Sequence, residues 1–194
     1  MLESAVEHLL HNVLPAAVDY IAAEDALSIA HKVSLSAVGW EIEARLAKRR
    51  AAELAIAIDG LPDRCKQELG LAVVQIRATV ATLCAFPGTT SLRPGSLERV
   101  RGVANAYKHE NLSDPTLPIT SDADILVVGL GYGREGFGVG KPGGVEVLVR
   151  DKNRISWKFL GDAPTTIAAW FSYLVSRGAV VPAGPHYFGG LVVG

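Results

Sequence analysis

The sequence is poor in sulfur, and this scarcity limits the chemistry that the chain can carry. It contains two cysteines and one methionine among 194 residues. Cys65 and Cys84 fall in one continuous predicted helix, roughly 28 Å apart at the helical rise of about 1.5 Å per residue. Cysteines that far apart cannot form a disulfide. We therefore expect two reduced thiols without a redox or metal role, and a fold held by its hydrophobic core.

The sequence also lacks an excess of charge of one sign and a long apolar run. Its 19 Lys and Arg nearly balance 20 Asp and Glu, so overall positive charge cannot drive binding to nucleic acid. Binding through a local basic stripe is still an alternative. No apolar run reaches the roughly 18 residues that span a bilayer. The first residues, MLESAVEHLLHNVLP, carry Glu3 and Glu7 and do not resemble a signal peptide. We expect a cytoplasmic protein with no membrane partner.

The first 112 residues predict helices. Apolar residues recur at helical spacing, and Gly and Pro mark the ends of the periodic segments. The expected helices cover residues 2–30 with a kink or boundary at Pro15, 36–58, 63–83 and 96–109. Because short connections favour neighbouring amphipathic helices as packing partners, we expect an N-terminal antiparallel helical bundle.

The pattern changes near residue 113. Alternating or β-branched apolar residues at 119–130, 144–150 and 155–160 predict a small antiparallel β-sheet, with a hairpin turn at 151–154. Asp162 is the expected N-cap of a C-terminal helix that runs to Arg177. The fold class is therefore α+β, with a helical bundle at 1–112 and the sheet and helix at 113–194 packed on it as one unit. Residues 179–194 give no clear assignment.

A glycine-rich stretch, GLGYGREGFGVGKPGG at 129–144, contains a match to G-x-G-x-x-G. That motif holds a pyrophosphate only where a helix begins directly behind the glycines, and here more glycines and a strand follow. Pro142 occupies the place of the Ser or Thr that a phosphate-binding loop needs after its Lys. We therefore predict a connection between two strands and no nucleotide or other cofactor. The alternative is a contact surface for a ligand or partner, formed by Tyr132, Arg134 and Lys141.

The helix at 96–109, SLERVRGVANAYKHENL in its sequence context, carries a polar stripe. At about 100° per residue, Arg101, Asn105, Lys108 and His109 fall within one sector of about 100°. Two cations, an amide and an imidazole suit recognition of an anion. The alternative is the solvated face of an amphipathic helix.

A helical bundle followed by the N-x-x-K-H of VANAYKH resembles the HEPN domains, and this region together with GLGYG is similar to bacterial proteins of uncharacterised function. HEPN ribonucleases carry an Arg followed, after four to six residues, by a His. Here seven residues separate Arg101 from His109, and nine separate Arg99 from it. The resemblance implies a metal-independent ribonuclease with an arginine holding phosphate, Asn105 positioning it, and His109 as acid or base.

The residues by themselves favour a binding or regulatory protein. It would contact an anionic or protein partner through the 101–109 helix face and the 129–144 loop. The Ala-rich helices suit self-association, and nucleic acid is a possible partner. His8 and His11 lack a third ligand, so we expect no metal site.

Overall fold

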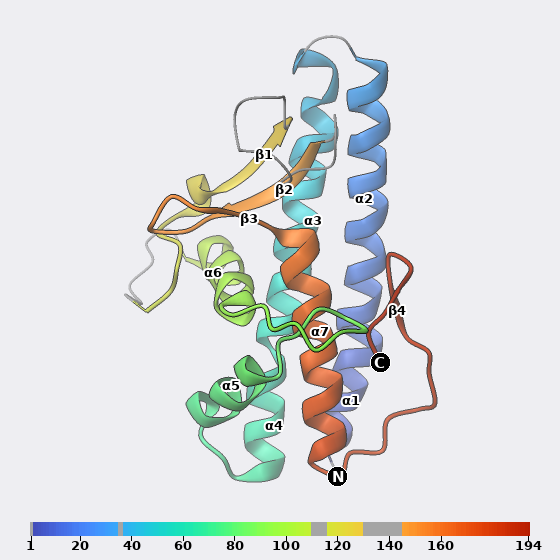
Figure 1. Ribbon diagram of the computed structural model, residues 1–194, viewed down its shortest axis with the longest axis vertical. Helices are drawn as coiled ribbons and strands as arrows, with labels where there is room; N and C mark the ends of the chain where they lie inside the picture. Colours follow the sequence, from blue (N-terminus) through green and yellow to red (C-terminus); the bar gives the residue numbers. More distant parts are fainter. Residues whose placement is uncertain (1, 35–36, 110–115, 130–144) are drawn as a thin grey trace.

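The computed structural model describes residues 2–34, 37–109, 116–129 and 145–194. It confirms the α+β class, with helices first, then a small antiparallel sheet and a long helix near the C-terminus (Figure 1). The helices are α1 (Glu3–His8), α2 (Leu14–Val33), α3 (Glu41–Asp59), α4 (Leu61–Leu69), α5 (Val73–Thr82), α6 (Ser96–Lys108) and α7 (Phe159–Ser176). The strands are β1 (Ile125–Gly129), β2 (Val145–Arg150), β3 (Ser156–Lys158), β4 (Tyr187–Phe188) and β5 (Leu191–Val192).

The first predicted helix is one rod with an irregular turn. α1 passes through a π-helical turn, Leu9–Val13, into α2. Pro15 lies at the second position of α2, directly after this π-helical turn. α3 returns antiparallel to α2, and the two helices form a hairpin that extends past the sheet (Figure 1).

The expectation of one helix over 63–83 is wrong. The chain breaks at Gly70, whose φ of 66° is left-handed and ends α4, and α5 then begins at Val73. The distance argument for Cys65 and Cys84 therefore fails, because the two residues do not share a helix. Both thiols are nevertheless free and buried. Burial raises the pKa of Cys65 to about 12 and that of Cys84 to about 11, so neither is a ready nucleophile.

The sheet has the order β1-β2-β3, and both pairs are antiparallel. The predicted hairpin at 151–154 is present: the Asp151 amide donates to the Ile155 carbonyl, and the Asp151 carboxylate accepts from the amides of Asn153 and Ile155. Val145, Val147 and Val149 on alternate positions of β2 are fully buried in the core shared with the helices. The connection between β1 and β2 lies outside the described residues.

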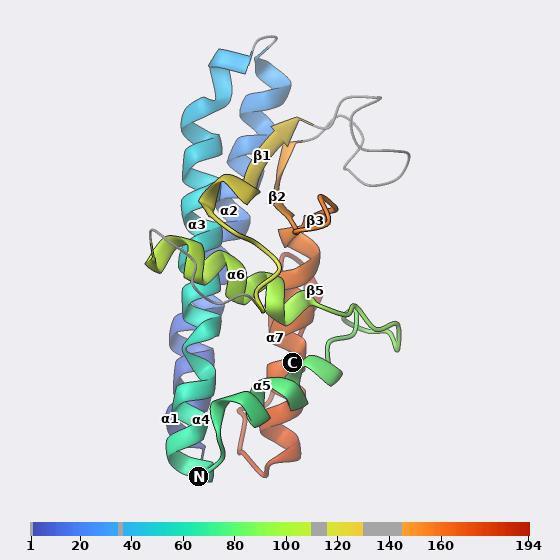
Figure 2. The same cartoon turned by 90° about the vertical axis from the view of Figure 1, so that its left-hand side faces the viewer.

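Two layers make up the molecule. α2 and α3 form one, and the sheet, α6 and α7 lie on one side of it (Figure 2). The C-terminal segment that the sequence left unassigned forms the β4–β5 hairpin, which packs on α2. There the ring of Tyr20 has its centroid 5.2 Å from that of Phe159 and 6.5 Å from that of Phe188.

Candidate anion-binding site

The polar stripe of α6 meets a buried carboxylate from another helix. Asp59 is the last residue of α3, and its side chain is only 8% exposed. Lys108 Nζ lies 3.0 Å from Asp59 Oδ2, Arg77 Nη2 lies 2.8 Å from Oδ1, and Arg101 Nε lies 3.9 Å from Oδ1. We call Asp59, Arg77, Arg101 and Lys108 the Asp59 cluster. Three cations from two helices thus share one carboxylate.

The packing of α3, α5 and α6 explains this convergence. α3 ends at Asp59, and Gly60 and Pro62 mark the start of the next helix, α4. α6 packs across α3 through Val100, Val103 and Ala104, all fully buried. The side chains at the next angular sector of α6 therefore reach the end of α3, and α5 brings Arg77 to the same carboxylate.

Asn105 and His109 do not join the cluster. The Asn105 Nδ2 donates to the Arg101 carbonyl at 3.0 Å, a bond within the helix. His109 leaves the helix with φ −134° and ψ 131°, and its side chain is exposed. The structure thus brings together Arg101 and Lys108 of the predicted set and leaves His109 next to them at the end of α6. The loop residues Tyr132, Arg134 and Lys141 lie outside the described residues.

Sequence reasoning missed Asp59 and Arg77. Asp59 lies beside the Gly60 and Pro62 that predict a helix end, and Arg77 lies in a mostly apolar predicted helix. Neither position indicates a charged partner elsewhere in the chain. The residues of the cluster lie up to 49 positions apart, so their meeting depends on how α5 and α6 pack rather than on any local spacing.

A second arginine cluster is buried between α6 and α7. Asp162, predicted as a helix cap, lies inside the first turn of α7, which begins four residues earlier than expected, so that prediction is wrong. Its carboxylate is fully buried and accepts from Arg99 at 2.7 Å through both oxygens and from Arg93 Nε at 2.6 Å. The Arg99 guanidinium also lies 4.0 Å from the centroid of Trp157. Arg99 is paired with Asp162 and only 4% exposed, so its guanidinium is not accessible to a phosphate.

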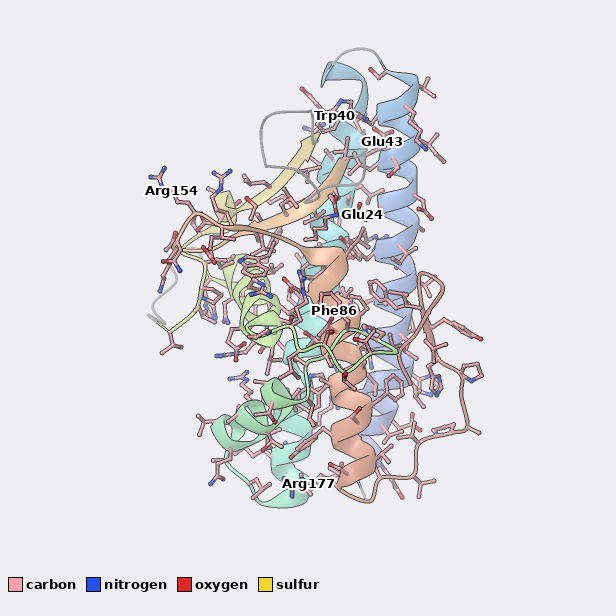
Figure 3. The ribbon with its side chains drawn as sticks, in the orientation of Figure 1. Glu24, Trp40, Glu43, Phe86, Arg154 and Arg177 are labelled. Carbon is pink, nitrogen blue, oxygen red and sulfur yellow. The ribbon has the colours of Figure 1, made fainter. Side chains whose placement is uncertain are left out.

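A third buried acid joins the two layers. Glu24 of α2 is 1% exposed and accepts from the Tyr20 hydroxyl at 2.7 Å and from the Val147 amide of β2 at 3.0 Å (Figure 3). Burial, followed by the charge of Glu24, raises the pKa of the Tyr20 hydroxyl well above its ordinary value. Glu24 therefore links β2 of the sheet to α2 through a buried hydrogen bond.

The described residues contain neither a metal-binding group of side chains nor a membrane-spanning helix. No three His, Cys, Asp or Glu side chains gather there into a group that could hold a metal ion. No helix in the same residues combines the length and apolar character needed to cross a membrane. Comparison of the chain with protein-family models, with curated proteins and with solved structures gave no match.

Proposed function

We propose that this protein is a binding protein that receives an anionic group of its ligand or partner at the Asp59 cluster. The observation that carries the proposal is the convergence of Arg77, Arg101 and Lys108 on one carboxylate. Cations that the fold holds close together repel one another, and an incoming anion relieves that repulsion. Asp59 aligns the cations, so little ordering remains to be done when the anion binds.

The cluster is neither fully buried nor fully solvated. The exposed fractions of the side chains are 16% for Arg101, 24% for Arg77 and 34% for Lys108. Partial removal from water strengthens an ionic contact, while the exposed part remains open to a ligand. Arg77 Nε is a buried donor without a hydrogen-bond partner in the described part of the chain. A phosphate or carboxylate group matches the paired donors of an arginine fork.

The most direct test is a calorimetric titration of the full chain with pyrophosphate at low salt. Arg77→Gln and Lys108→Gln each remove one cation, and Arg154→Gln removes an exposed cation at the tip of the β2–β3 hairpin (Figure 3). Because a charged hydrogen bond contributes about 1.5–3 kcal/mol, we expect each cluster variant to weaken binding by roughly tenfold or more. Arg154→Gln should bind as the wild type does. Absence of wild-type binding, or equal weakening by all three variants, contradicts the proposal.

A ribonuclease of the HEPN type is the second candidate, and one observation favours it. The His109 imidazole is exposed and follows Lys108 directly, so a phosphate at the Asp59 cluster would have a titratable group nearby. Mixed RNA incubated without metal tests this candidate with wild type and His109→Ala. Cleavage lost in a variant that still binds pyrophosphate supports the nuclease, whereas absence of cleavage by the wild type removes it and leaves the binding proposal standing.

A further inference from the structure

The outer face of the α2–α3 hairpin exposes large apolar side chains. Ile29 is 64% exposed, Val33 80%, Ile42 71% and Leu46 40%. Val18 of α2 is 65% exposed as well. We call these five residues the hairpin patch. A helix face that meets only solvent is usually polar, so a row of exposed apolar residues here is typical of a surface that binds another protein.

The five residues lie on one face of the hairpin. At about 100° per residue, Ile29 and Val33 lie within about 60° of Val18 on α2, and Leu46 lies about 40° from Ile42 on α3. The ion pair between Asp19 and Arg50, at 3.5 Å, marks the side on which the two helices face each other. On both helices, a rotation about the helix axis leads from this contact to the apolar residues, and viewed from the N-terminus of each helix the rotation has the same direction. Because the helices are antiparallel, both stripes lie on the same face of the hairpin. The sheet packs on the other face (Figure 2).

Charged residues at the two outer edges of this face are complementary. Asp25 borders the stripe on α2 and Arg45 borders it on α3, both exposed. Neither has an ion-pair or hydrogen-bond partner within the described residues. Two contacts fix the level of these residues along the hairpin: Asp19 beside Arg50, and the ring of His31 5.7 Å from that of Trp40. Asp25 and Arg45 are midway between these contacts, so they lie at the same height on opposite edges.

We propose that a second copy of this chain binds the hairpin patch in a twofold-symmetric dimer. A twofold axis parallel to the helices places α2 of each copy on α3 of the other, which forms a four-helix arrangement. That axis keeps each residue at its own height and exchanges the two edges. Asp25 of one copy then meets Arg45 of the other, and symmetry makes the contact twice. The complementary edges are the reason for choosing a second copy over an unrelated protein.

Charge exchange tests this arrangement by sedimentation equilibrium of the full chain. The wild type should form a dimer. Asp25→Arg and Arg45→Asp should each raise the dimer dissociation constant by about tenfold, because each creates two like-charge contacts per dimer. The double variant Asp25→Arg with Arg45→Asp should restore wild-type association. Both residues are exposed in the monomer, so circular dichroism should show the same fold in all variants.

Two results overturn the proposal. A wild-type chain that stays monomeric at high concentration shows that a second copy does not cover the patch. A dimer that the single variants leave unchanged, or that the double variant fails to restore, excludes the Asp25–Arg45 arrangement. Ile42→Asp provides a further check, since it should abolish the dimer by placing a charge in its centre. None of these residues belongs to the Asp59 cluster, so the outcome is independent of anion binding.

Discussion

Asp162 joins three parts of the chain through a single carboxylate. It accepts from Arg93 in the loop before α6 and from Ser96 and Arg99 in α6, while the backbone around it belongs to α7. The carboxylate is fully buried, so its charge depends on these partners. Two arginines near the ring of Trp157 would in turn lose this counter-charge if Asp162 were neutral.

Asp162→Asn should therefore lower the free energy of unfolding by about 3–5 kcal/mol, the usual loss when one partner of a buried ion pair is removed. Urea denaturation measures this change. Asp63→Asn, at an exposed aspartate of α4, should leave stability within about 0.5 kcal/mol of the wild type. Similar losses in the two variants would contradict the role given to Asp162.

His8 gives the stability a pH dependence. Burial is the main cause that lowers the pKa of His8 below its ordinary value of 6.5, and the charge of Arg64 lowers it further. The neutral ring lies with Nε2 2.8 Å from the Ala57 carbonyl, and Nδ1 is buried without a hydrogen-bond partner among the described residues. The unfolded chain thus binds a proton at higher pH than the folded chain does. Stability from this residue is present above pH 6.5 and is lost as the pH falls below it.

His8→Gln should flatten this part of the profile, because the amide does not titrate and can still donate to Ala57. Urea midpoints measured between pH 7 and pH 5 for the wild type and the variant provide the comparison. The wild type should lose more stability across that range. Parallel profiles would show that protonation of His8 is not linked to unfolding.

At the scale of elements, α6 depends on close contact with the segment before the sheet. A Cβ atom at Gly102 would lie 2.7 Å from Cγ1 of Ile119, which is itself 1% exposed. Alanine normally stabilises a helix relative to glycine by about 1 kcal/mol. Here the clash should outweigh that gain, because overpacking a core typically costs about 1–3 kcal/mol.

Gly102→Ala should therefore destabilise the protein in thermal unfolding despite its better helix propensity. Ile119→Ala removes the clashing atoms, so the double variant should be more stable than the sum of the two single effects indicates. Strict additivity, or a stabilised Gly102→Ala variant, would contradict the close packing of α6 on Ile119.

The sequence predicts these elements well where a local pattern decides them. The amphipathic spacing of α6 puts Val100, Val103 and Ala104 in the core, and the predicted 151–154 turn forms between β2 and β3. The prediction of one helix over 63–83 is wrong because the apolar periodicity continues past Gly70, whereas the chain turns there in a left-handed conformation.

At the scale of the whole molecule, the candidate site forms where three chain segments meet. Helical spacing alone groups Arg101 with Lys108, but it gives no information about Asp59 or Arg77, which depend on the crossing of α3, α5 and α6. The sequence likewise predicted Asp162 as a cap, because a cap and a buried acid at a helix start have the same local pattern. Residues that act through long-range contacts are therefore the ones that sequence reasoning missed.

An anion that binds at the Asp59 cluster would change the surroundings of the Arg77 Nε–H group, so the NMR signal of this group is a direct test of binding. We would record the arginine Nε–H signals by NMR spectroscopy while adding pyrophosphate, with Arg77→Gln to assign the signal and Arg154 as an exposed reference. We expect a saturable shift of the Arg77 signal and no comparable shift at Arg154. An Arg77 signal that stays fixed, or that moves only as Arg154 does, would show that the Asp59 cluster does not bind the anion.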